Sequence, residues 1–234
     1  MVGMPVLSPE NYEALASKYE NQDPRSHLPS TYTREQVDGY GAQQAVYSRL
    51  MRSPETTFNE MMMFQPGGSI QNLHPVSRGT VFINPSDPEG DVIVDYRGAS
   101  NAIDLDIMVE NIRFMRRYMA SSELAQYGPR ETSPGSNYTT TEQLVDWARE
   151  QIIPSVFHPV GTCAKMPREL GGCLDEQLRV YGTRRLSVID ASMMPTLVGA
   201  TTSMTVYAVA EKVRRLLPPT YHQMIIDKEN RLRI

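Results

Sequence analysis

Apolar residues recur at helical spacing in three stretches of this chain, and each stretch ends at a helix-breaking signal. Residues 102–127 carry the longest such pattern, and Gly128 and Pro129 follow it. Residues 140–153 begin with a threonine able to cap a helix, and two prolines follow residues 203–217. The pattern therefore predicts three helices. The apolar positions of the longest are Ile103, Ile107, Met108, Ile112, Met115 and Met119.

Shorter apolar runs predict strands. Residues 79–85 and 91–96 alternate apolar and polar side chains around a turn-forming segment, 86–90, which is typical of a hairpin. Residues 185–190 form a short run with β-branched side chains and predict a buried strand, and the run 61–64 predicts an interior strand. Helices and antiparallel strands in separate parts of the chain indicate an α+β fold.

The first part of the chain is less regular. Residues 9–20 predict a short helix and residues 33–52 a longer one, although Gly39 and Gly41 weaken it, and a polar connection at 22–29 joins them. The chain holds 14 methionines, a residue that fills irregular spaces well. We interpret them as ordinary core residues, with a wide pocket lined by thioethers as the alternative.

Composition and charge narrow the class of protein. The 234 residues are 40% hydrophobic and 21% charged, which is ordinary for a globular protein with a sizeable core. A net charge of -4 without a basic run argues against nucleic acid or an anionic membrane as the main partner. No stretch approaches the roughly 20 apolar residues of a membrane span. The N-terminus lacks the pattern of a signal peptide, and the cellular location stays open.

Cysteine and histidine are the residues here most suited to catalysis or cross-linking. Cys163 and Cys173 are too few for a disulfide framework; their short separation leaves a single bridge open, but we do not expect one. His27 and His222 lie in polar segments and are interpreted as exposed and inert. His74 precedes a proline in a segment without other chemical groups, and we interpret it as structural.

His158 has more distinctive surroundings. It lies between Phe157 and Pro159, and the proline biases it toward extended backbone, so its imidazole would be presented from a turn or a strand end. Further on, the small and hydroxylated residues 199–203 precede a predicted helix. Backbone N–H groups at a helix entry are free to meet a polar or anionic ligand.

Five ordered stretches share the pattern of one known family. They are SIQNLHPVSRGTVFINPSDP at 69–88, HPVGT at 158–162, GGCLDEQLRVYG at 171–182, VIDASMMP at 188–195 and ATTSMTVYAVAEK at 200–212. Together they resemble the C-terminal half of the glucose-methanol-choline (GMC) flavin oxidoreductases. The number and order of the motifs make the resemblance specific.

The resemblance implies a particular α+β architecture. An antiparallel substrate-domain sheet flanked by helices would be followed by the terminal strand and helix of a GMC-type flavin domain. The implied regions are a partial substrate or cap region (1–64), the GMC C-terminal substrate-binding domain (65–156), an active-site loop, strand and helix (157–218), and a C-terminal tail (219–234).

The resemblance also implies FAD as cofactor and oxidation of a CH–OH group. His158 would take the alcohol proton while hydride leaves the adjacent carbon, which suits an imidazole because its pKa lies near neutrality. A second histidine or an asparagine usually follows in the family, but that position falls on Thr201, which cannot act as a base. We interpret Thr201 as a substrate contact or a helix cap. The residues implied to lie near the cofactor are Asp190, Ala191, Thr202 and Ser203.

The G-x-G-x-x-G turn that opens the family's dinucleotide-binding half does not occur in this sequence. We therefore expect a flavin-linked enzyme piece without the adenosine site. It would act on a small-molecule alcohol within a larger or split enzyme, completed by a second chain or by a homodimer. Two alternatives stay open: a truncated protein that catalyses a redox-neutral cyclisation or isomerisation, and a non-catalytic partner subunit.

Overall fold

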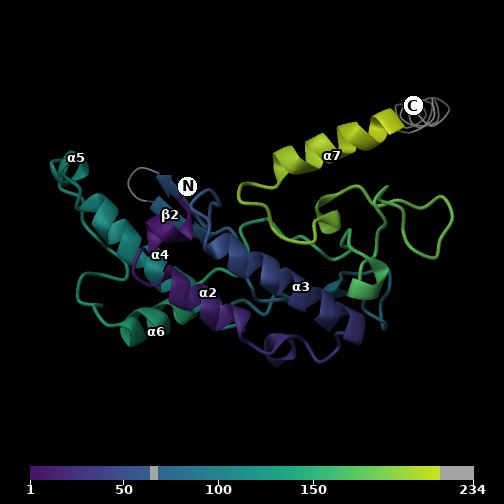
Figure 1. The fold of residues 1–234 in the computed structure, drawn as a ribbon, viewed down its shortest axis with the longest axis horizontal. Coiled ribbons are helices and arrows are strands. Elements are labelled where there is room, and N and C mark those ends of the chain that lie inside the picture. The colour runs from purple at the N-terminus through teal and green to yellow at the C-terminus, as the bar shows by residue number, and fades with distance from the viewer. Residues whose placement is uncertain (64–67, 217–234) are drawn as a thin grey trace.

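The computed structural model describes residues 1–63 and 68–216. Helices from the first two thirds of the chain lie together, whereas the last third is mostly loops, with one long helix lying beside them (Figure 1). Within the described ranges, no helix is both long enough and apolar enough to cross a membrane.

The N-terminal region is helical. Its elements are α1 (Met4–Leu7), α2 (Tyr12–Glu20), the 3-10 turn η1 (Pro24–His27) and α3 (Arg34–Met51). Helix α3 starts with a capping box, because Thr33 Oγ1 accepts from the Gln36 N–H and Gln36 Oε1 accepts from the Thr33 N–H. The helices predicted at 9–20 and 33–52 are confirmed, with slightly shorter bounds.

Two small antiparallel sheets follow. Strand β1 (Asn59–Met63) pairs with β2 (Gly68–Asn72), and β3 (Thr80–Phe82) pairs with β4 (Ile93–Asp95). The predicted hairpin is confirmed, as is the α+β class. The run 61–64 was predicted as an interior strand, and that prediction is wrong in one respect. Residues 61–63 do form part of β1, but a two-stranded sheet leaves them partly open and Met63 is exposed. Phe64 lies outside the described residues.

The longest predicted helix is divided in the structure. Helix α4 (Ile103–Met119) ends at Ala120, and a separate turn of helix, α5 (Ser122–Ala125), follows. Ser121 has extended backbone, with φ -60° and ψ 150°, which breaks the helix without disturbing the apolar spacing that predicted it. Helix α6 (Thr141–Gln151) is confirmed, with Thr140 and Gln143 forming its capping box.

The main core is formed by helices α1, α2, α3 and α4 together with residues of the connecting segments. Tyr19, Tyr47 and Phe58 are among its largest fully buried side chains. A polar network borders it: buried Asp104 accepts hydrogen bonds from the Val76 and Ser77 N–H groups, which ties the approach to β3 onto α4. The buried members of this core are Met4, Leu7, Leu15, Ala16, Tyr19, Leu28, Tyr40, Tyr47, Met51, Phe58, Val76, Ile103 and Ile107.

The C-terminal region contains two 3-10 turns, η2 (Arg168–Leu170) and η3 (Ala191–Met193), and helix α7 (Ser203–Leu216). Helix α7 confirms the third predicted helix as far as the described residues reach. The prediction of a buried strand at 185–190 is wrong. A strand needs a partner along its length, and within the described chain this segment has one isolated bridge, from Ser187 to Arg179. Its Leu186 is half exposed.

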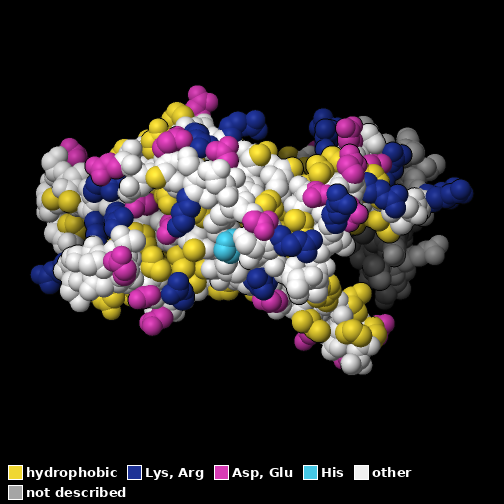
Figure 2. Space-filling model, turned by 60° about the horizontal axis from the view of Figure 1, so that its bottom comes forward, with side chains coloured by type: hydrophobic (Ala, Val, Ile, Leu, Met, Phe, Trp, Pro, Cys, Tyr) yellow, Lys and Arg dark blue, Asp and Glu magenta, His cyan; other side chains and the backbone are white. Residues whose placement is uncertain are grey.

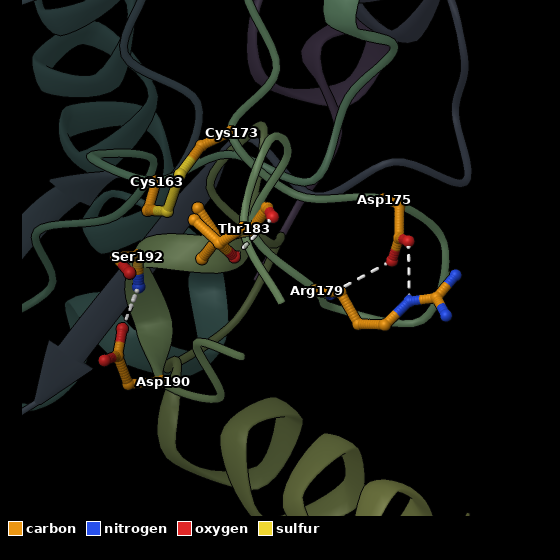
Figure 3. The surroundings of a disulfide bond; sticks show 8 residues. Cys163, Cys173, Asp175, Arg179, Thr183, Asp190 and Ser192 are labelled. Carbon is orange, nitrogen blue, oxygen red and sulfur yellow. Dashed lines mark hydrogen bonds and ion pairs between the residues drawn. A yellow bond between two sulfur atoms is a disulfide. The ribbon is translucent and has the colours of Figure 1, made fainter. Parts of the chain in front are cut away.

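A disulfide joins Cys163 to Cys173, contrary to our expectation (Figure 3). Both half-cystines pack against a second core built from Leu174, Leu178, Met193, Met194 and Val213. The disulfide therefore closes a loop that packs against the apolar core shared by η3 and α7. Local spacing alone could not show that the two sulfur atoms meet, because that depends on how the loop folds back.

Candidate active site

A large cavity of about 1850 Å³ opens between the helices and the C-terminal loops. Helices α3, α4 and α6, both hairpins and residues 152–164 contribute to its walls. Methionines are prominent among the lining residues: Met62, Met63, Met108, Met115, Met119 and Met166. Others, including Met4 and Met51, are fully buried in the core. Some methionines are therefore ordinary core residues, and others line a wide pocket.

His158 lines this cavity and is half-buried. The preceding residue, Phe157, has a φ of 59° and a side chain that is 96% exposed. A left-handed conformation is uncommon for a residue with a Cβ and costs about 1–3 kcal/mol where the surroundings impose it. The backbone turns sharply here, and it presents the imidazole from a loop, as the His158-Pro159 pair predicts.

Residues 195–197 also line the cavity. The loop 195–199, to which they belong, is held by hydrogen bonds from side chains that are distant in sequence. Gln43 Nε2 of α3 donates to the Pro195 carbonyl at 2.9 Å, and Thr57 Oγ1 donates to the Gly199 carbonyl at 2.6 Å. A Cβ at Gly199 would lie 2.5 Å from Thr57 Oγ1, so only glycine fits this approach. Sequence analysis missed Gln43 and Thr57, because their partners are far away in the chain.

His74 lies behind that loop in the core, in agreement with its structural interpretation. Its ring is 4.8 Å from the Phe58 ring and 5.4 Å from the Tyr47 ring, measured between centroids. Burial lowers the pKa of His74 to about 4, although nearby backbone of Leu197 and Thr57 opposes the shift. His74 is therefore neutral at physiological pH. Of the histidines interpreted as exposed, His27 is half-buried in η1 and His222 lies outside the described residues.

The other predicted site residues flank η3 and the start of α7. Asp190 is exposed, and its carboxylate accepts the Ser192 N–H at 2.8 Å, so it caps η3 (Figure 3). Thr201 and Ser203 are exposed, whereas Thr202 is only 7% exposed at the entry to α7. Ala191 is half-buried in η3. Among the predicted site residues, the structure brings only His158 to the cavity wall.

A half-buried cation on the cavity wall was missed by sequence analysis. The Arg78 guanidinium lies 5.2 Å from the Tyr40 ring centroid and 5.9 Å from that of Tyr47, and it donates to Gln43 Oε1 at 2.9 Å. Burial raises the pKa of the Tyr47 hydroxyl, and the Arg78 charge partly opposes the shift. Tyr40 and Tyr47 fall seven residues apart on one face of α3, a helical spacing that could have revealed this platform.

Comparisons with known proteins define the class. Among solved structures, an FAD-dependent oxidoreductase from Chaetomium thermophilum matches 99% of this chain and 38% of its own, with a TM-score of 0.88 at 27% identity. A fungal aryl-alcohol oxidase matches 91% of this chain and 37% of its own, with a TM-score of 0.85 at 33% identity. The fold is therefore that of part of an FAD-dependent oxidoreductase.

Sequence comparison specifies the family. The GMC oxidoreductase model matches residues 75–210, and dehydrogenase xptC of Emericella nidulans is 30% identical over 88% of this chain and 33% of that protein. The chain belongs to the GMC oxidoreductase family, whose cofactor is FAD. It spans about a third of the length of the relatives that it matches.

The entry to α7 offers backbone donors that suit a polar edge of FAD. The nearly buried Thr202 side chain marks the entry to α7, where first-turn N–H groups lack helical partners and favour a polar or anionic edge. The Asp190 carboxylate is already engaged in its own turn, so this segment would approach a cofactor mainly through its backbone. No glycine-rich dinucleotide turn occurs in the sequence, so the adenosine end has no counterpart here.

Proposed function

We propose that this chain supplies the substrate-side half of an enzyme that oxidises CH–OH groups of alcohols with FAD. The observation that carries the proposal is the position of His158 on the wall of a large cavity, within the segment that matches the GMC family. Among its relatives are proteins named as dehydrogenases and one named alcohol dehydrogenase [acceptor] from Pseudomonas putida, 30% identical over 148 residues.

In this proposal, His158 is the catalytic base. A neutral imidazole accepts the hydroxyl proton of the alcohol and leaves the carbinol carbon ready to lose hydride. Bound FAD would supply the hydride acceptor, and the alcohol would become a carbonyl compound. Thr201 does not line the cavity, and its role is a helix cap or a substrate contact; in neither role does it carry a proton away, because a hydroxyl is not a base at neutral pH.

The cofactor contacts fall on Asp190, Ala191, Thr202 and Ser203. We assign Thr202 and Ser203 to backbone N–H donation from the entry of α7, which stabilises negative charge at the edge of the cofactor. Asp190 and Ala191 hold the η3 turn in place, and their backbone is the part that approaches the cofactor. These roles are electrostatic and positional, and no proton is transferred by them.

The rest of the flavin site must come from another polypeptide segment, which we propose is a second chain, another copy or the remainder of a longer protein. Large apolar side chains remain open to solvent on the C-terminal part: Phe157, Leu186, Met204 and Tyr207. Figure 2, in which the lower edge of Figure 1 is turned forward, shows hydrophobic side chains among charged ones on that face of the molecule too. Grouped exposed apolar residues are typical of a surface that another structure covers.

The test is a chimera in which residues 1–234 replace the matching part of the fungal aryl-alcohol oxidase. After incubation with FAD and removal of free flavin, we expect a yellow protein that oxidises alcohols. The chain alone should stay colourless, because it lacks the adenosine site. A folded chimera without flavin, or a flavin-loaded chimera that oxidises no alcohol, would contradict the proposal.

Thr201 supports a second candidate function. Loss of the second polar base removes part of the oxidation machinery, which favours a redox-neutral cyclisation or isomerisation, or a non-catalytic partner subunit. A chimera with Thr201→His distinguishes these readings. If oxidation appears only in that variant, the natural chain has lost redox chemistry.

A further inference from the structure

We propose that the methionine wall of the cavity, formed by Met108, Met115 and Met119 of α4 beside Trp147 of α6, binds an aromatic group of the substrate. The inference rests on the proposed alcohol oxidation and narrows its substrate class to bulky aromatic alcohols. It gives the wall a specificity role that is separate from the proton transfer assigned to His158.

The wall is a continuous helical face. Met108, Ile112, Met115 and Met119 recur at intervals of three and four residues, so they stack along one side of α4, and all line the cavity. Their methionines are half-buried, which leaves the thioethers accessible from the cavity. Met108 and Trp147 pack against the same small core. An occupant of this region would therefore meet sulfur and an indole ring together.

A clasp on α4 fixes the neighbouring wall. Arg116 pairs with Glu131 through both guanidinium nitrogens Nε and Nη2, at 3.0 and 2.8 Å, and Arg116 Nη1 donates to the Tyr138 carbonyl at 2.8 Å. The segment 129–134 thus lines the cavity beside the methionines, and the charges of the clasp neutralise each other.

The other charged groups on the walls offer little to a strongly polar substrate. Asp104 is buried and saturated by backbone N–H groups, and Arg78 is engaged by Gln43 and by backbone carbonyls. Asp95 and Arg130 are exposed to solvent. Thioethers bind aromatic rings more favourably than simple burial predicts, with sulfur near the ring edge. The methionine wall, unlike the parts of the lining that carry neutral polar side chains, therefore favours an aromatic group over a sugar or a saturated ring.

The experiment measures binding to the 234-residue chain without flavin, by calorimetry, and compares biphenylmethanol with its fully saturated counterpart, bicyclohexylmethanol. Trp147 is the single tryptophan of the chain, so its fluorescence reports whether the ligand reaches this wall. We expect biphenylmethanol to bind about tenfold more tightly and to change the Trp147 emission.

The double variant Met108→Leu/Met115→Leu keeps apolar volume and removes sulfur. It should reduce the difference between the two affinities, because only Met119 and Trp147 of the wall remain, whereas Met204→Leu, on the exposed surface of α7, should leave the aromatic preference intact. Equal affinities in the natural chain, an undiminished preference in the double variant, or no binding at all would overturn the inference. Turnover is not measured here, so failure of His158 as a base would leave this result standing, and the reverse also holds.

Discussion

Two histidines of this chain precede prolines, and their surroundings separate them. His74 is 5% exposed between the rings of Phe58 and Tyr47, whereas His158 lies half-buried on the cavity wall. Both are followed by Pro-Val, and the sequence distinguished them through the wider surroundings of His158 and through the family resemblance. The burial of His74 could not be predicted from its neighbours in sequence, because Tyr47 and Phe58, which surround its ring, lie 16 or more residues earlier in the chain.

The buried His74 makes stability depend on pH. Its folded pKa of about 4 lies below the ordinary value of 6.5, so the unfolded chain binds the proton more readily. The free energy of unfolding is therefore unaffected by His74 above pH 6.5, and it falls by about 3 kcal/mol in total as the pH is lowered toward 4. Urea unfolding from pH 4 to 7 should show this slope. His74→Phe should flatten it and His27→Gln should not; equal slopes in all three proteins would refute the assignment.

Among the elements, those defined by local signals could be predicted from sequence. The capping threonines Thr33 and Thr140 mark the starts of α3 and α6, and the turn at 86–90 marks the hairpin of β3 and β4. Elements that depend on distant partners could not be predicted. The run at 185–190 has strand-like residues, but its pairing in the described chain is limited to one isolated bridge, and the Cys163–Cys173 disulfide depends on how its loop folds.

Two glycines of α3 look alike in sequence and should respond in opposite ways to alanine. A Cβ at Gly39 would overlap the Leu170 carbonyl of η2, whereas one at Gly41 would meet Pro24 Cγ at an ordinary 3.4 Å. We expect Gly39→Ala to lower the free energy of unfolding by about 1–3 kcal/mol and Gly41→Ala to raise it by about 0.5–1 kcal/mol. Denaturant titration of both variants checks this pair. Similar effects would mean that η2 does not pack against α3 as described.

The disulfide should stabilise the C-terminal loops. Replacing Cys163 and Cys173 together by serine opens the loop that packs against the second core, and we expect a loss of about 3 kcal/mol in the free energy of unfolding. Reduction of the natural chain should lower its urea midpoint to that of the serine-substituted protein. Midpoints that coincide in oxidised, reduced and serine-substituted proteins would show that the bridge does not form in solution.

At the scale of the whole molecule, the chain is part of a GMC oxidoreductase fold. It has two main cores, a large cavity and a set of exposed apolar residues, but it spans only about a third of its relatives. The resemblance predicted the family and the α+β class. It could not predict the cavity lining, because the methionine face of α4 and the clasp from Arg116 to Glu131 are products of packing.

The central claim is that His158 is the base of a flavin-linked alcohol oxidation. The most direct measurement is the anaerobic rate of flavin reduction in the chimera, using the alcohol that it oxidises fastest. His158→Ala should slow that rate by roughly 10²- to 10⁴-fold while the flavin absorbance and the melting temperature stay unchanged. An unchanged rate in a flavin-loaded His158→Ala chimera would contradict the account.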